Sequence, residues 1–118
     1  MQVSTRAVSI LLVIVALLGL SHIATAQDPV YFADANLKAA VESALGISNP
    51  TPTDMLLLTS LSAVNRQIVD LTGIEYATNL TSLDLVWNQI RDISALSGLI
   101  HLTELMLLEN QIRDISAL

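Results

Sequence analysis

Residues 80–96 read LTSLDLVWNQIRDISAL, and residues 102–118 read LTELMLLENQIRDISAL. The two stretches match at 13 of 17 positions when aligned at a spacing of 22 residues, and residues 88–96 return unchanged at 110–118. A more divergent copy precedes them in the same phase, with apolar residues at Leu58, Leu61, Ala63, Ile68, Leu71, Ile74 and Ala77. Self-similarity at this period predicts a solenoid in which each copy forms one coil.

The shared pattern, L-x-x-L-x-L-x-x-N-x-I-x-x-I-x-x-L, resembles a leucine-rich repeat. That resemblance implies an α/β fold, a right-handed leucine-rich repeat solenoid with short parallel strands on its concave face. We expect about three coils in residues 58–118, the last one incomplete. Strands are predicted over residues 83–85 and 105–107, where side chains alternate between the two faces. The inward side chains are then Leu83, Leu85, Leu105 and Leu107.

Asn88 and Asn110 follow the two predicted strands at the same repeat position. A buried amide there can bond the backbone of its own and the adjacent coil, at about 1 kcal/mol net for each bond. We therefore predict that both asparagines form a structural ladder. Arg66 holds this position in the first coil, and an unpaired buried charge is costly. We expect Arg66 to turn outward and the preceding segment to supply substitute bonds.

The isoleucines and leucines after the ladder are predicted to form the convex half of the core: Ile90, Ile93, Leu96, Ile112, Ile115 and Leu118. Arg91-Asp92 and Arg113-Asp114 should stack one coil apart. They form either a recognition stripe or a solvated face with weak ion pairs, since exposed pairs contribute only about 0–1 kcal/mol.

Residues 1–26 are predicted to be a secretory signal peptide. Arg6 precedes an apolar run over residues 7–20, and Ala24-Thr25-Ala26 is a cleavage site of the A-x-A type. An uncleaved anchor is the alternative, although a bilayer span takes roughly 20 apolar residues. We expect a secreted or cell-surface protein with no membrane insertion after cleavage.

Residues 27–57 are predicted to form a helical N-terminal cap. Asp34 suits the start of a helix and Gly46 its end. Apolar residues on one helical face are Leu37, Ala40, Val41, Ala44 and Leu45. Thr53 is predicted to cap a second short helix over residues 54–57. Because the terminal coil of a solenoid exposes its apolar interior, we expect this segment to cover it.

Residues 32–46 read FADANLKAAVESALG, and Thr53-Asp54-Met55 and the 22-residue repeats follow. Together they resemble the capped N-terminus of the internalin family of bacterial surface proteins. Residues 71–80, LTGIEYATNL, resemble the first coil of that family. The resemblance covers about residues 32–118 and implies the capped solenoid described above. Such repeats carry many unrelated binding functions.

The charge balance narrows the classes of partner. The formal net charge is −6, and the segment after residue 26 holds four basic residues against eleven acidic ones. This acidic balance argues against nucleic acid and against an anionic membrane surface as binding partners, because both carry negative charge. The chain has no cysteine, which excludes disulfides and thiolate metal sites. Its two histidines are too few for a metal cluster. With no catalytic motif either, we predict no enzyme activity, no metal and no cofactor.

The two close copies differ at four positions, all on or beside the outward face of the predicted strands. These positions give the candidate partner-binding residues Ser82, Asp84, Val86, Trp87, Glu104, Met106, Leu108 and Glu109. Four of them, Val86, Trp87, Met106 and Leu108, would form an apolar patch. Its acidic rim would be Asp84, Glu104 and Glu109, and such patches often mark partner sites. The alternative is that Trp87 packs over the solenoid edge and the others vary neutrally.

We therefore predict a module that binds a protein ligand through its concave face. One alternative is a structural spacer at the N-terminus of a larger envelope protein. The other is glycan binding, which Trp87 alone supports. Since the repeat stops at Leu118 partway through a coil, we also expect a fragment of a longer product or a poorly soluble polypeptide.

Overall fold

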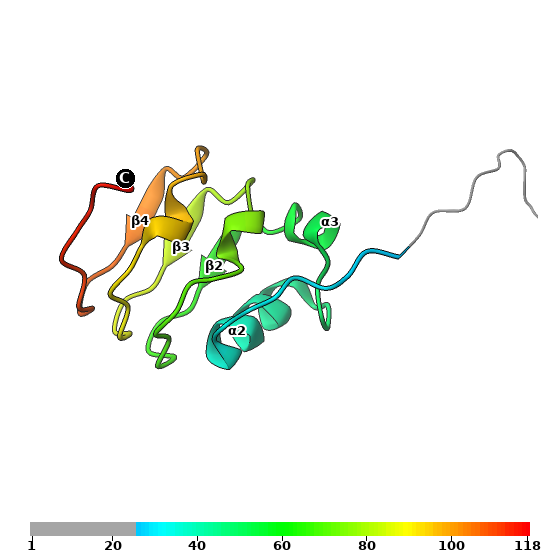
Figure 1. Cartoon of the computed structure of the whole chain (residues 1–118), viewed down its shortest axis with the longest axis horizontal. Coiled ribbons are helices and arrows are strands. Elements are labelled where there is room, and N and C mark those ends of the chain that lie inside the picture. Colours follow the sequence, from blue (N-terminus) through cyan, green and yellow to red (C-terminus); the bar gives the residue numbers. More distant parts are fainter. Residues whose placement is uncertain (1–25) are drawn as a thin grey trace, which may run out of the picture.

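The computed structural model describes residues 26–118, so the predicted signal peptide falls outside the described residues except for Ala26 (Figure 1). The elements are α2 (Ala35–Leu45), α3 (Pro52–Met55), β2 (Ser60–Ser62), the 3-10 helix η2 (Ile74–Tyr76), β3 (Ser82–Asp84), η3 (Ser94–Leu96) and β4 (Glu104–Met106). Among these, no helix has the length and apolar character that a membrane crossing requires.

Three parallel strands form one sheet in the order β2-β3-β4. Leu61 pairs with Leu83 and Leu83 with Leu105, so neighbouring strands are offset by one 22-residue repeat. The 3-10 helices η2 and η3 lie on the other side of their coils from the strands (Figure 1). This arrangement confirms the predicted α/β leucine-rich repeat solenoid.

The strands begin one residue earlier than predicted. Thr81 and Ser82 both donate their backbone N–H to the carbonyl of Thr59, and Thr103 and Glu104 do the same to Thr81. Backbone pairing therefore starts at the threonines. Each threonine hydroxyl also donates to the preceding threonine carbonyl, at 3.0 Å from Thr81 and 3.2 Å from Thr103.

The core runs through the first two coils and weakens in the last. Leu83, Leu85 and Ile90 are fully buried, whereas Leu105, Leu107 and Ile112 are only partly buried. The predicted convex core is correct for Ile90, Ile93 and Leu96. It is wrong for Ile115 and Leu118, which are 67% and 62% exposed. Each coil is covered by the next one, and within residues 26–118 nothing packs on the last coil.

Helix α2 lies beside β2 at the opposite end of the sheet (Figure 1). As predicted, Asp34 precedes the helix as N-cap and Gly46 ends it in the left-handed conformation, with φ at 69°. Leu37, Ala40 and Val41 are buried, but Ala44 is exposed and Leu45 half-buried. The buried face is shorter than predicted, because its buried residues all lie in the first seven positions of the helix.

Helix α3 has a different cap from the predicted one. It begins at Pro52, and Thr51 rather than Thr53 is its N-cap. The Thr51 hydroxyl accepts from the Asp54 N–H at 3.2 Å, while the Asp54 carboxylate accepts from the Thr51 N–H at 2.8 Å. Proline suits the first helical position because the N–H that it lacks would have no partner there.

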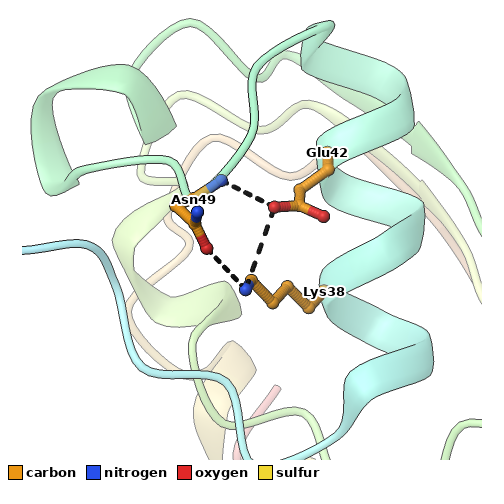
Figure 2. A network of polar contacts seen from close by, with 3 residues as sticks. All are labelled: Lys38, Glu42 and Asn49. Carbon is orange, nitrogen blue, oxygen red and sulfur yellow. Dashed lines mark hydrogen bonds and ion pairs between the residues drawn. The ribbon is translucent and has the colours of Figure 1, made fainter.

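A polar network fastens the loop after α2 to the helix (Figure 2). The Lys38 ammonium donates to the Asn49 side-chain oxygen at 2.6 Å. The Glu42 carboxylate accepts from the Asn49 N–H at 2.6 Å and lies 3.9 Å from the Lys38 ammonium. Pro50, the next residue, accepts from the N–H of Val30 through its carbonyl, at 2.8 Å. Helix, loop and N-terminal segment are therefore held together beside the first coil.

Candidate functional site

The strands present their outward side chains on one surface, which we call the outer sheet face. It corresponds to the concave face predicted from the repeat. The 22-residue register stacks side chains from the three coils into columns. Four columns form this face: Ser60–Ser82–Glu104, Ser62–Asp84–Met106, Val64–Val86–Leu108 and Asn65–Trp87–Glu109.

Part of this face is apolar and open to solvent. We define the apolar patch as Val64, Val86, Trp87, Met106 and Leu108. Val86 is half-buried, and the other four are 40%, 60%, 39% and 75% exposed in that order. Adjacent coils are joined here because Asn65 donates its N–H to the Val86 carbonyl and Trp87 to the Leu108 carbonyl. Val64 was not among the predicted residues of this face, although it lies 22 residues before Val86 and the repeat period indicates it.

The column that contains Trp87 has an unusual backbone. Asn65, Trp87 and Glu109 have φ values of 54°, 64° and 57°, so the chain leaves each strand through the left-handed region. Asparagine tolerates this conformation, whereas other non-glycine residues lose about 1–2 kcal/mol in it. Trp87 is thus held at a strained position with its side chain 60% exposed.

Asn88 ties the first two coils together directly after this column. Its Oδ1 accepts from the N–H groups of Arg66 and Ile68 at 3.0 and 2.9 Å. Its Nδ2 donates to the carbonyls of Ala63 and Leu85, each at 2.8 Å. Asn88 is the one buried polar side chain among the described residues, at 7% exposure.

Asn110 repeats this arrangement one coil later. Its Oδ1 accepts from the Ile90 N–H at 3.0 Å, and its Nδ2 donates to the carbonyls of Leu85 and Leu107 at 2.8 and 3.0 Å. Each asparagine therefore reaches back to the preceding coil and fixes the ends of two strands. This fixes where the columns of the outer sheet face lie.

The first coil is held from the other side by Asp34. Its Oδ1 accepts from the N–H groups of Asn36 and Leu37 at 2.9 and 3.3 Å and so caps α2. Its Oδ2 accepts from the N–H groups of Val69 and Asp70 at 2.7 and 3.2 Å. One carboxylate thus joins the helix to the coil. Bonds from this segment to the first coil were predicted, but Asp34 was not identified as their source. Partial burial acts to raise the pKa of Asp34, but these four backbone bonds lower it below its ordinary value.

Arg66 is exposed, as expected. Each ladder asparagine forms hydrogen bonds with the coil that precedes its own. Arg66 lies in the first coil, so no earlier strand is present for its side chain to bond. The Arg66 N–H donates to Asn88 of the next coil. The bonds expected from the preceding segment are present, because Asp34 accepts from Val69 and Asp70, and the Asn36 side chain donates to the Gln67 carbonyl at 3.5 Å.

The acidic residues of the outer sheet face lie on the second and third coils. Asp84 uses one oxygen to accept from the Val86 N–H at 3.1 Å. Glu104 uses one oxygen to accept from the Ser82 hydroxyl at 3.0 Å. Glu109 is exposed, and no hydrogen bond within residues 26–118 involves its carboxylate. These groups form an acidic rim beside the apolar patch.

On the convex side, the aspartates bind backbone rather than arginine. Asp92 and Asp114 accept from the N–H groups of Ser94 and Ser116 at 2.8 and 2.9 Å. Those bonds lower the pKa of both aspartates. Arg91 donates to the Gln111 side chain at 2.8 Å. Within residues 26–118 no ion pair joins either arginine of the repeat to an aspartate, so the predicted weak ion pairs are wrong.

The described part of the chain holds no candidate metal site. Between residues 26 and 118, no group of three histidine, aspartate or glutamate side chains is placed to hold a metal ion. The outer sheet face offers apolar contact, hydrogen-bond acceptors and one indole, which are means of binding.

Strand register, asparagine ladder and period define a leucine-rich repeat protein. A family model described as leucine-rich repeats in two copies matches residues 78–118. Internalin InlF from Listeria monocytogenes is 39% identical, with a TM-score of 0.70 over 73% of this chain and 26% of that one. Internalin C2 from the same organism is 36% identical, with a TM-score of 0.72 over 81% of this chain and 46% of that one.

A third solved structure, of CBM51-2 in complex with GlcNAc and INT domains from Clostridium perfringens ZmpB, is 30% identical, with a TM-score of 0.61. It matches 66% of this chain and 17% of its own length. Curated protein sequences gave no match. The chain is a leucine-rich repeat protein that resembles the internalin family. It spans about a quarter of InlF and under half of internalin C2.

Proposed function

We propose that this chain is a protein-interaction module whose partner binds the outer sheet face. The repeats and the similarity to internalins support an interaction module. The observation that carries the proposal is the apolar patch. Its five side chains come from all three coils, and four of them are at least 39% exposed. Exposed apolar patches rimmed by polar groups are typical of binding sites.

The chemistry of the patch also favours a protein partner. Trp87 offers a large rigid aromatic surface, and tryptophan is enriched among residues that dominate binding energy. Met106 and Leu108 supply adaptable aliphatic contact beside it. Ser82, Asp84, Glu104 and Glu109 provide the polar margin that usually surrounds an apolar interface centre.

The proposal assigns the rest of the chain to supporting roles. Residues 1–26 are a signal peptide, residues 27–57 a helical cap and residues 58–118 the binding repeats. The mature chain is secreted or held at the cell surface, as its internalin-like character suggests. It acts by binding and not by catalysis.

Glycan binding is the second candidate, and the exposed Trp87 favours it because an indole face suits a sugar ring. The spacer role is the third, in which the outer sheet face contacts nothing. A glycan array tests the second candidate with wild-type protein and Trp87→Ala. Specific array binding that the variant loses supports the glycan candidate.

Two variants of the last coil test the proposal on matched positions. Leu108→Glu places a charge in the patch, and Ile115→Glu places the same charge on the convex side, where the side chain is 67% exposed. Binding to an array of extracellular proteins should be lost in Leu108→Glu and kept in Ile115→Glu. Equal binding by both variants, or no binding by the wild type, would contradict outer-face recognition.

A further inference from the structure

We propose that the partner presents arginine or lysine side chains among apolar ones, and that one such cation lies over the Trp87 indole. This inference rests on the proposed function and names the chemistry of its partner. It follows from where the charges lie around the apolar patch.

Negative charge surrounds the patch on the second and third coils. Asp84, Glu104 and Glu109 belong to the outer sheet face, and Asp84 and Glu104 each commit one carboxylate oxygen to a bond within the chain. Their other oxygens, and the whole carboxylate of Glu109, are available to a donor from outside. A partner with acidic groups here would meet like charges, which suppresses binding.

Positive charge in residues 26–118 is sparse and mostly elsewhere. Lys38 of α2 is engaged with Glu42 and with Asn49 of the following loop. Arg91 donates to Gln111 on the convex side, and Arg113 lies beside that pair. Arg66 borders the outer sheet face but lies in the first coil, whose outward positions hold no acid. The face is therefore polarised, with its acidic half over the second and third coils.

Trp87 sits within this acidic half. A guanidinium or ammonium within about 6 Å of an indole centre is attracted to the face of the ring. Glu109 occupies the same column one coil later, and strands are spaced about 4.8 Å apart. A cation over the indole would thus have a carboxylate close by. The aliphatic stem of an arginine or lysine could then lie along Val86 and Leu108, as such stems do on apolar surfaces.

Trp87 is the single tryptophan of the chain, so intrinsic fluorescence reports on this position alone. The probes are four synthetic peptides: acetyl-(Leu-Arg)3-amide, its citrulline analogue of equal shape without charge, its glutamate analogue, and acetyl-(Gly-Arg)3-amide. The arginine–leucine peptide should change the fluorescence and bind at least tenfold more tightly than the other three. Its affinity should fall several-fold between 50 and 500 mM salt, because salt screens exposed charges.

A matched pair of charge reversals locates the effect. Glu109→Lys should weaken the arginine–leucine peptide at least fivefold. Asp28→Lys makes the same change in net charge at an exposed position before the helix and should leave the affinity unchanged. Equal weakening by both variants would assign the effect to net charge and overturn the local contact.

Other outcomes separate this inference from the function beneath it. If the citrulline peptide binds as tightly as the arginine peptide and Leu108→Glu weakens both, the charge preference is wrong while outer-face binding stands. Preference for the glutamate peptide, or no fluorescence change with any peptide, overturns the inference.

Discussion

Substitutions of Asp34 should distinguish the two stabilising contacts of its carboxylate, which are the cap of α2 and the bonds to the first coil. Asp34→Asn keeps an oxygen for the N–H groups of the first helical turn, and asparagine is as good an N-cap as aspartate. The amide group that replaces Oδ2 cannot accept from Val69 and Asp70. Asp34→Ala removes both contacts.

The expected losses in the free energy of unfolding follow from the backbone N–H groups that each substitution leaves without an acceptor. Loss of a cap costs about 1 kcal/mol. Bonds to a charged acceptor contribute about 1.5–3 kcal/mol when shielded, but Val69 and Asp70 are exposed and water can replace part of this. We therefore expect about 1–2 kcal/mol for Asp34→Asn and about 2–3 kcal/mol for Asp34→Ala. In a domain of this size each kcal/mol lowers Tm by roughly 4–8 °C.

The effect should depend on pH in a definite direction. The pKa of Asp34 is lower in the folded chain than its ordinary value of 3.8. The stabilisation is therefore complete above that value and is lost as the pH falls through the folded pKa. Urea unfolding of wild type and Asp34→Asn should differ at pH 7 and converge toward pH 3.

The assay is urea unfolding followed by circular dichroism at several pH values. Asp28→Asn is the control, because it removes the same charge from an exposed site. An Asp34→Asn variant as stable as wild type at pH 7 would refute the clamp between helix and coil. An undiminished difference at pH 3 would show that the carboxylate charge is not its source.

Three further predictions concern the solenoid, each measured by thermal and urea unfolding. Asn88→Ala should cost about 2–4 kcal/mol because it leaves buried backbone groups unpaired, whereas Asn110→Ala should cost less, since its surroundings reach water; an Asn88→Ala variant as stable as wild type would refute the ladder. Gly73→Ala should cost about 2–4 kcal/mol, since its φ is 109° and an added Cβ would lie 2.5 Å from the nearest ring atom, while Gly98→Ala meets nothing within 4 Å and should be nearly neutral. Trp87→Asn should raise stability by up to about 1 kcal/mol, because asparagine tolerates the left-handed backbone; lower stability would show that the indole contributes packing.

The repeat could be predicted from the sequence because a 22-residue period fixes which side chains point inward. Leu83 and Ile90 are buried where the period places them. The ends of the strands could not be predicted, because they depend on backbone bonds from Thr81 and Thr103 that the leucine pattern does not show. The exposure of Ile115 was missed since periodicity says nothing about which coils are covered.

The candidate site was only partly visible in the sequence. The outward positions of the last two coils followed from alternation along the strands. Val64 was missed because the first copy is divergent, and the left-handed backbone at Trp87 has no signal in residue type. The Asp34 clamp spans 35 residues to Val69, and such a tertiary contact leaves no local pattern. The choice between Thr51 and Thr53 was decidable, since Pro52 at the first helical position favours Thr51.

The outer sheet face can be tested directly because the chain has no cysteine of its own. Single variants Val64→Cys, Leu108→Cys and Ile115→Cys each place one thiol at an exposed position. Their rates of maleimide labelling would be compared with and without saturating acetyl-(Leu-Arg)3-amide. Binding at the outer sheet face predicts slower labelling at positions 64 and 108 and an unchanged rate at 115. Protection at 115 alone, or equal protection at all three positions, would contradict it.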